Sequence, residues 1–181
     1  MNLAEAHRLI NHGPVVLVTC GSTPHNIITV AWITPVSHTP PLLAISVGVR
    51  RYSRELIDRI GEFVVNVPSA ELLGAVWICG TRSGRDIGKF EEAGLTPIPS
   101  ENVIPPCIAE CMAWLECGVR KRVEVGDHVL FVGEVLSATA RADAFNRFYR
   151  LSPHNRTLHH LGGDHFAIAE TVVEAKERRP D

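Results

Sequence analysis

The sequence predicts a mainly β fold, a small antiparallel barrel with helices at its periphery. Runs rich in β-branched residues are joined by brief loops, at residues 14–20, 26–33, 41–49 and 62–68. Two further runs share residues 108–139 and are separated by Gly126-Asp127, a typical hairpin turn. Such short connections favour antiparallel neighbours, because parallel strands need long crossovers. Helical patterns occur only as short insertions, so we expect helices around the barrel rather than inside it.

Helical periodicity marks five short segments, at residues 1–10, 52–61, 69–80, 83–94 and 142–150. In the second of these, Ser53 is the expected N-cap and Gly61 the expected stop. We expect no regular structure in the Pro-rich connection 96–106 or in the polar tail 151–166. The sequence therefore places its helices between strands, as covers for an antiparallel sheet.

Length and composition indicate one globular domain over residues 1–181, because 45% of the residues are hydrophobic and 21% are charged. The formal net charge is −2, and the dense basic stretches are short, at 120–122 and 176–179. Both stretches are expected to be solvated faces rather than phosphate tracks. We expect no nucleic-acid partner.

The chain carries no apolar run of the ~18–20 residues that a membrane-spanning helix needs. Its N-terminus, MNLAEAHRLINHG, has no apolar stretch like that of a signal peptide. Five cysteines, an odd number without a CxxC pair, argue against a secreted disulfide framework, at positions 20, 79, 107, 111 and 117. We expect a cytoplasmic protein that does not bind membranes.

Residues 26–41, NIITVAWITPVSHTPP, place polar groups and a large aromatic side chain where a predicted strand ends. Asn26 and Thr29 interrupt the apolar run, which closes on Trp32 before a loop with three prolines. A strand end lets backbone and side chains meet a ligand while the scaffold stays rigid. This stretch therefore predicts a binding site.

The segment SVGVRRYSREL, residues 46–56, combines a glycine, two arginines and a hydroxyl at a helix start. Gly48, Arg50 and Ser53 suit a phosphate monoester, since helix N-termini and guanidinium groups bind anions. The alternative is a capped surface helix with two solvated arginines. SGRDIGKF, residues 83–90, lacks the spacing of a nucleotide phosphate loop, although Lys89 is placed to reach an anion.

Histidines and cysteines gather in two places without forming a recognisable metal site, at 154, 159, 160 and 165 and at 107 and 111. Their spacing matches neither a structural zinc site nor the HExxH of a metalloprotease. No GxSxG motif indicates a serine hydrolase. We expect no metal.

The order of several motifs resembles the flavin reductase-like FMN-binding split barrels, especially the flavoredoxin branch. The matching stretches are residues 26–41, Arg50 to Ser53, EFVVN at 62–66, CGTRSGRDIGKFEEAGL at 79–95 and GDHVLFVGEV at 126–135. The resemblance implies an antiparallel split β-barrel that binds FMN near the interface of a homodimer. NADH or NADPH is the implied electron donor, and an oxygenase or another electron acceptor is the possible downstream partner.

The resemblance also implies roles for individual residues. Asn26, Trp32, Ile33 and Thr34 are expected along the isoalloxazine and ribityl chain. Ser46 and Val47 are expected to offer backbone contacts, and His128 to lie near the flavin as the candidate catalytic residue. The phosphate contacts and the aromatic cover are expected from Arg50, Ser53, Lys89 and Phe166.

Three functions remain open from the sequence. The first is an NAD(P)H-dependent flavin reductase that passes hydride from a nicotinamide to FMN N5. The second is a non-enzymatic FMN electron-transfer protein of the flavoredoxin type. The third is a binding protein that uses the same barrel for haem or another ligand. The sequence does not choose between NADH and NADPH, because it lacks the acidic residue by which a Rossmann fold recognises the ribose 2′-hydroxyl of NAD.

Overall fold

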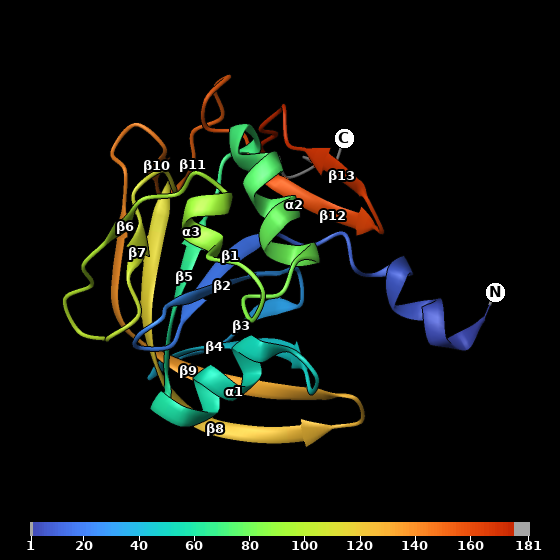
Figure 1. The fold of residues 1–181 in the computed structure, drawn as a ribbon. Helices are drawn as coiled ribbons and strands as arrows, with labels where there is room; N and C mark the ends of the chain where they lie inside the picture. The colour runs from blue at the N-terminus through green and yellow to red at the C-terminus, as the bar shows by residue number, and fades with distance from the viewer. Residues whose placement is uncertain (1, 176–181) are drawn as a thin grey trace.

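The computed structural model describes residues 2–175, whose main feature is a curled antiparallel sheet with helices packed against it (Figure 1). The seven strands lie in the order β2-β1-β5-β8-β9-β4-β3. Their bounds are β1 (Val16–Cys20), β2 (Asn26–Val30), β3 (Ile33–His38), β4 (Pro41–Gly48), β5 (Glu62–Val67), β8 (Ala113–Val125) and β9 (His128–Ala140). The predicted mainly β, antiparallel fold is confirmed.

The sheet curls because two strands that follow each other in the chain lie at its opposite edges. β2 and β3 are the two edge strands, yet only Ala31 and Trp32 separate them. A two-residue link cannot cross the width of a flat sheet, so the edges must approach each other. The result is a barrel that is open between β2 and β3. The backbone bond from Ser46 N to Trp32 O, 2.9 Å long, holds the link against β4.

The inside of the curled sheet is filled by apolar side chains from six of its strands and from helix α1 (Tyr52–Ile60). Phe63 and Phe131 are the largest fully buried members of the core. Gly133 on β9 makes room for Phe63, since a Cβ at this glycine would come within 2.7 Å of the ring. Close packing of this kind leaves little freedom for added atoms.

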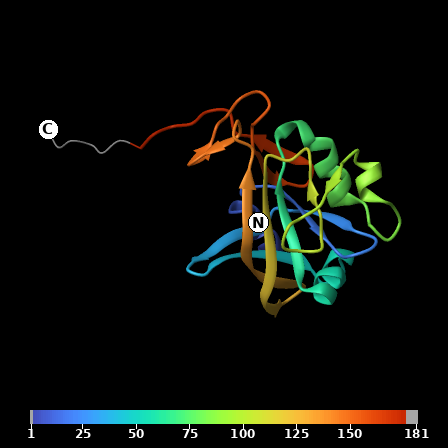
Figure 2. The same ribbon diagram turned by 90° about the vertical axis from the view of Figure 1, so that its left-hand side faces the viewer.

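A second apolar cluster covers the outer face of β1 and β2, where α2 (Leu73–Thr81) and α3 (Lys89–Glu92) pack. Figure 2 shows these helices in green on one side, while the β3–β4 hairpin in light blue projects on the other. Gly80 lets α2 approach β2 closely, because a Cβ there would lie 3.2 Å from Cβ of Thr29. The Thr29 hydroxyl donates to the Val76 carbonyl across this contact, at 2.5 Å.

The helix predicted at 52–61 is confirmed, but its start differs from the prediction. Gly61 ends it in the left-handed conformation, with φ of 69°. The N-cap is Arg51 rather than Ser53, and its side chain makes no capping bond. Ser53 lies inside the first turn and is buried, because Asn26 reaches it from β2 and donates a 2.7 Å hydrogen bond.

The loop predicted after Trp32 is wrong, because residues 33–38 form strand β3 despite their proline. Pairing with β4 supplies the reason: Ile33 lies opposite Ile45 and Thr34 opposite Ala44. Pro35 is accommodated at the register shift between Pro35 and Ser37. An edge strand tolerates proline, since one side of its backbone needs no ladder partner.

Three helix predictions are also wrong in extent or type. The segment 83–94 is helical only in α3, and 142–150 forms two short strands, β10 (Phe145–Asn146) and β11 (Phe148–Tyr149). The N-terminal segment is a 3-10 helix, η1 (Leu3–Leu9), that buries none of its residues. The segment 69–80 is confirmed as helical, through η2 (Ala70–Leu72) and then α2.

Two segments predicted to be irregular contain paired strands. The tail forms a hairpin of β12 (Leu158–Gly162) and β13 (His165–Ile168). The Pro-rich connection contributes β6 (Pro97–Ile98), which pairs with β7 (Cys107–Ile108). Val15 N donates to Leu158 O at 3.0 Å, so the tail hairpin is anchored beside the start of β1. No helix among residues 2–175 is long and apolar enough to cross a membrane.

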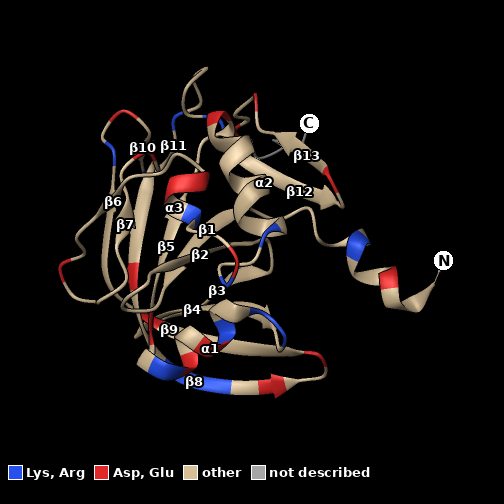
Figure 3. Ribbon diagram, viewed as in Figure 1, with Lys and Arg blue, Asp and Glu red and all other residues tan. Residues whose placement is uncertain are grey.

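The basic run at 120–122 lies on β8, where Figure 3 shows acidic residues close by. Arg120 pairs with Glu134 at 2.6 Å, and Arg122 pairs with Asp58 at 2.7 Å. These exposed pairs match the solvated face predicted for this run, whereas the second basic run, 176–179, lies outside the described residues. Exposed ion pairs contribute little stability, on the order of 0–1 kcal/mol each.

Candidate functional site

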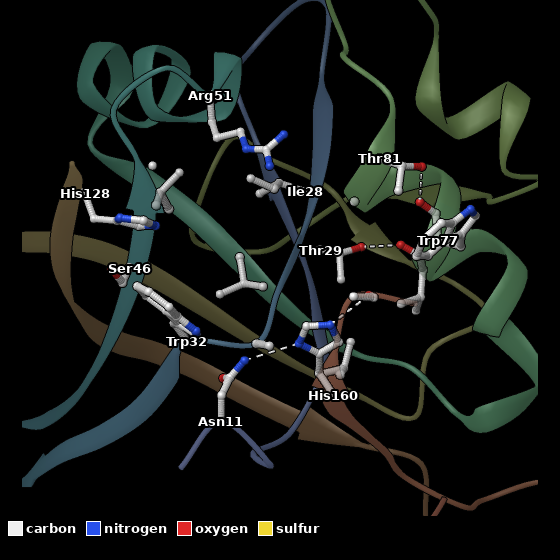
Figure 4. A pocket seen from close by; sticks show the side chains of 18 of the residues that line it. Asn11, Ile28, Thr29, Trp32, Ser46, Arg51, Trp77, Thr81, His128 and His160 are labelled. Carbon is white, nitrogen blue, oxygen red and sulfur yellow. Dashed lines mark hydrogen bonds between the residues drawn. The ribbon is translucent and has the colours of Figure 1, made fainter. Parts of the chain in front are cut away.

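The main cavity opens beside the link between β2 and β3 and has a volume of about 400 Å³ (Figure 4). Its walls come from β2, β4, α2, the start of β9, the tail hairpin and the N-terminal segment. Ligand pockets in proteins typically measure about 300–1,000 Å³. The cavity is thus large enough for a small molecule, and it lies where residues 26–41 predicted a site.

Aromatic side chains form much of the cavity wall. Trp32, Trp77 and Phe166 line it from three separate parts of the chain. The Trp32 ring stacks on His128, with ring centroids 4.7 Å apart and planes at 27°. His7 meets the same Trp32 ring edge-on at 5.2 Å. Flat apolar walls of this kind suit a planar ring system.

Arg51 supplies a positive charge at one end of the cavity, above Ile28 in Figure 4. It forms no ion pair with any residue of the 2–175 range. Gly48 leaves space beside it, since a Cβ at Gly48 would lie 3.6 Å from Arg51 Cγ and 3.8 Å from His128 Nε2. A guanidinium without a carboxylate partner, in a concave site, favours an anionic ligand.

The two terminal segments meet at the other end of the cavity. Asn11 Nδ2 lies 3.2 Å from His160 Nδ1, and His160 Nε2 lies 3.1 Å from the Gly163 carbonyl. The carbonyl only accepts, so Nε2 carries the proton and Nδ1 accepts from Asn11. Phe166 lies beside the His160 ring, with centroids 5.3 Å apart. The hydrogen bond therefore joins the N-terminal segment to the tail hairpin at the cavity wall.

A buried polar cluster lies at the inner ends of β2, α1 and α3, formed by Asn26, Ser53 and Lys89. Asn26 Oδ1 is buried without a hydrogen-bond partner in the described part of the chain. Lys89 Nζ donates to the carbonyls of Ile27 and Cys79, each at 2.7 Å. Burial lowers the pKa of Lys89, and the positive charge of Arg51 acts in the same direction. Lys89 thereby ties α3 to β2 and α2.

The structure brings five of the predicted site residues together in the main cavity. They are Trp32, Ser46, Val47, His128 and Phe166. The Ser46 backbone N–H already donates to Trp32 O, so this group is not free for the ligand contact expected of it. Phe166 reaches the wall because the tail folds into the β12–β13 hairpin, which the sequence did not predict.

The other predicted residues lie elsewhere. Ile33 and Thr34 line a neighbouring hollow of about 570 Å³, which shares Trp32 with the main cavity. Arg50 is exposed on the loop before α1 and does not line the main cavity. Asn26, Ser53 and Lys89 are the buried cluster described above, behind the cavity rather than in its wall.

Several lining residues were missed by sequence reasoning. Arg51 lines the cavity, whereas the sequence reasoning singled out its neighbour Arg50, because sequence spacing cannot say which of two adjacent exposed arginines borders a cavity. Trp77 lies on an apolar helix and is 44% exposed, which only the structure reveals. Asn11 and His160 are joined across 149 positions of the chain, so no local signal connects them.

The histidines and cysteines are dispersed in the structure. His154 pairs with Glu71 and His165 with Asp164, each at 2.7 Å. No group of three or more metal-binding side chains is found among residues 2–175. All five cysteines are free and buried.

A family model described as the flavin reductase like domain matches residues 8–162, most of this chain. The chain belongs to the flavin reductase-like family. The family resemblance expected from the sequence motifs is therefore confirmed. Among its relatives, a protein of Archaeoglobus fulgidus is 48% identical over 71% of this chain and 72% of its own length. A flavin reductase of Pseudomonas putida is 35% identical over 65% of this chain and 66% of that enzyme.

Solved structures of the family share the fold of this flavin reductase-like domain. An FMN-binding domain of a flavin reductase-like enzyme from Shewanella baltica superposes with a TM-score of 0.81 at 29% identity. The match covers 97% of this chain and 96% of that one. A flavoredoxin from Methanosarcina acetivorans has a TM-score of 0.81 at 25% identity, over 90% and 88% of the two chains.

FMN is the cofactor that this family implies, and the donor set of the cavity fits it. Trp32, Trp77 and Phe166 offer apolar walls for a planar ring system. Arg51 offers an unpaired cation for a phosphate, and the Thr81 and Ser46 side chains line the space near the ring walls. The aromatic and cationic groups thus match the two chemically different ends of FMN.

Proposed function

We propose that this flavin reductase-like protein holds FMN in the main cavity and acts as an NAD(P)H-dependent flavin oxidoreductase. The observation that carries the proposal is the aromatic wall joined to the unpaired Arg51 in one hollow of about 400 Å³. The P. putida flavin reductase and the FMN-binding S. baltica enzyme support it.

Each end of the cavity has its own proposed task. Arg51, which lines the cavity, binds the FMN phosphate in place of Arg50, which the sequence suggested and which does not line it. Trp32 and Trp77 flank the ring system, and Phe166 covers it from the tail hairpin. Asn26, Ser53 and Lys89 support the cavity from behind by fixing β2 against α1 and α3.

When bound, FMN would supply the redox chemistry by accepting a hydride from the nicotinamide and passing electrons on. The task of this chain's residues is then to bind, orient and exclude water rather than to act as strong acids or bases. Arg51 fixes the charged end of the ligand, and the Asn11–His160 bond closes the far end of the cavity. His128 presents a ring nitrogen beside Gly48, next to the stacked Trp32.

An FMN electron carrier of the flavoredoxin type is the second candidate. The flavoredoxin of M. acetivorans, at a TM-score of 0.81 and 25% identity, favours it. In that case the same cavity holds FMN, but a redox protein rather than a nicotinamide delivers the electrons.

We propose a cytoplasmic homodimer that takes electrons from NADH or NADPH and serves an oxygenase or another electron acceptor. The exposed edge strand β3 and an apolar hollow of about 520 Å³ beside it support a second subunit. Edge strands and apolar hollows are commonly covered in assemblies. Sedimentation of the purified protein at micromolar concentration checks this, and a monomeric mass with FMN bound contradicts it.

Two measurements test the proposed function. The visible absorption spectrum of the purified protein, with and without added FMN, reports flavin binding. Steady-state oxidation of NADH and of NADPH with added FMN then separates the reductase from the electron carrier. Flavin binding without nicotinamide oxidation favours the carrier, and a haem spectrum without flavin binding rejects both.

A further inference from the structure

The tripeptide Gly-Asp-His occurs twice in the chain, at 126–128 and at 163–165. Each copy lies at a hairpin turn, the first between β8 and β9 and the second between β12 and β13. In each, an aspartate oxygen lies 2.7 Å from Nδ1 of the following histidine. The first contact is a hydrogen bond, and because a carboxylate only accepts, Nδ1 of His128 must carry the proton.

The two histidine rings have different surroundings. His128 lines the main cavity and stacks on Trp32, and its side chain is 27% exposed. The His165 side chain is 80% exposed and does not line the main cavity. The aspartate–histidine pair is thus a local product of the turn, and only the first copy is directed at a site.

The second ring nitrogen of His128 lies on the cavity side. Asp127, whose side chain is 92% exposed, holds Nδ1 from the solvent side. Nε2 faces Gly48, where a Cβ would lie 3.8 Å away, and Gly48 is itself part of the cavity wall. With the proton fixed on Nδ1, Nε2 of the neutral ring is a hydrogen-bond acceptor.

Asp127 is also fixed through its backbone. Its carbonyl accepts a 3.0 Å hydrogen bond from Val49 N, in the loop that carries Arg51. His128 lies opposite Gly48 in the pairing of β4 with β9. The turn, the histidine and the Arg51 loop therefore form one connected unit. The hydrogen bond from His128 also lowers the pKa of Asp127, which keeps the carboxylate charged.

We propose that Asp127 is a positioning residue that holds His128 as the Nδ1–H tautomer and so presents Nε2 to the ligand as an acceptor. The group it receives is an amide N–H of a planar heteroaromatic ligand. The identity of that ligand rests on the proposed function: the carboxamide of a nicotinamide and the imide of a flavin both carry such an N–H.

The tautomer is measured directly in ligand-free protein. Two-bond ¹H–¹⁵N NMR spectra, recorded above the ordinary imidazole pKa of about 6.5, separate Nδ1–H from Nε2–H rings. We expect Nδ1–H for His128 in the wild type, a shift toward Nε2–H in Asp127→Ala, and retention in Asp127→Asn, whose side-chain oxygen still accepts. Asp164→Ala, at the corresponding position of the second copy, is the matched control and should leave His128 as the Nδ1–H tautomer.

The source of the amide N–H is read from binding and kinetics. One neutral hydrogen bond corresponds to about a two- to tenfold change in affinity. If the flavin imide is the donor, Asp127→Ala weakens FMN binding by this factor. If the nicotinamide carboxamide is the donor, KM for NADH rises by this factor while FMN affinity and kcat stay near the wild-type values. Asp164→Ala should change none of these quantities.

The possible failures are distinct. An Nε2–H tautomer in the wild type, or an unchanged His128 in Asp127→Ala, overturns the positioning role whatever the protein binds. A tautomer that shifts without any change in FMN affinity or in KM overturns the acceptor role toward the ligand. Absence of both flavin binding and NADH oxidation in the wild type defeats the proposed function and leaves the tautomer result standing. A melting curve of each variant shows whether it folds, and Asp127→Asn preserves the test if Asp127→Ala does not.

Discussion

Arg50 and Arg51 are neighbours of the same charge that face different surroundings. Both side chains are exposed and neither forms an ion pair with the described residues, but of the two only Arg51 lines the main cavity. The difference arises because β4 ends at Gly48 and α1 begins at Tyr52, which fixes the direction of each loop residue. The residue type thus predicts a positive charge at the site, while the loop conformation decides which of the two arginines lines the cavity.

Replacing Arg51 by alanine should weaken FMN binding by about ten- to a hundredfold, because hydrogen bonds to charged groups contribute about 1.5–3 kcal/mol. Riboflavin lacks the phosphate, so its affinity should change little in the same variant. Dissociation constants for both ligands, from titrations followed by flavin fluorescence, provide the measurement.

Arg50→Ala is the matched control for this substitution and should leave both affinities near those of the wild type. A phosphate-selective loss in Arg50→Ala instead would restore the assignment made from the sequence. Equal losses of FMN and riboflavin in Arg51→Ala would place Arg51 at the ring rather than at the phosphate.

At the scale of elements, strand β9 shows how closely the barrel interior is packed. Gly133 lies over the Phe63 ring, and a Cβ there would also come within 3.2 Å of Cys117 Cβ. Gly118 on the neighbouring strand β8 is different, since its added Cβ would meet Leu136 Cδ1 at an ordinary 3.5 Å. A side chain is therefore excluded at Gly133 by the Phe63 ring, whereas the space at Gly118 would admit a methyl group.

Gly133→Ala should lower the free energy of unfolding by about 1–3 kcal/mol, the usual cost of overpacking a core. Gly118→Ala should change it by less than that, because the added methyl group meets no tight contact. Urea unfolding followed by circular dichroism measures both variants. A smaller loss for Gly133→Ala than for Gly118→Ala would show that Phe63 moves aside without cost.

Local patterns predicted the central strands and helix α1 well, and the terminal elements poorly. Alternating β-branched residues and Gly61 are local signals that pairing and packing then reinforce. β3 was predicted as a loop because its proline outweighed its pairing with β4, a long-range effect. The β12–β13 hairpin was missed for a similar reason: it is held by contacts such as Val15 N to Leu158 O, far apart in the chain.

The residues of the candidate site also fall into a group that local motifs predicted and a group that depends on long-range packing. Trp32, Ser46, Val47 and His128 lie on central strands or in the links between them, and the structure brings them together as the motifs implied. Asn11 and His160 reach the cavity only through the folding of both termini. Lys89 lay in a helix pattern, and its burial against carbonyls could not be inferred without the packing of α3 on β2.

At the scale of the whole molecule, buried thiols should make the fold sensitive to alkali. Burial raises the pKa of Cys20 and of Cys117 to about 12 and that of Cys79 to about 11, from 9.0. Above pH 9.0 the unfolded chain loses these protons and the folded chain keeps them, so stability falls as the pH rises. Lys89 acts oppositely below 10.5, because its folded pKa is lowered, and offsets part of the loss.

Each such thiol should contribute about 1.4 kcal/mol per pH unit to that fall. Cys117→Ala should therefore make the fall of unfolding free energy with pH less steep by about this amount between pH 10 and 11. Urea unfolding at several pH values measures the slope. The free energy of unfolding at neutral pH does not enter the comparison, because only the slope reports the titration of the thiol. Identical slopes for wild type and variant would rule out a buried, protonated Cys117 as a contributor.

The two-residue link at Ala31 and Trp32 also makes the open side of the barrel the natural place for local unfolding. Edge strands separate from a sheet more readily than central ones, so amide hydrogens of β2 and β3 should exchange through a shared opening. The main cavity takes residues from β2 and from β4, so a ligand in it contacts both sides of the opening. FMN at a hundred times its dissociation constant should then raise the opening free energy by about 2.7 kcal/mol and slow exchange on both edges about a hundredfold. Slowing confined to β2 would mean that the two edges open independently. If exchange slows on both edges together, bound FMN stabilises the two edge strands as one unit and closes the open side of the barrel.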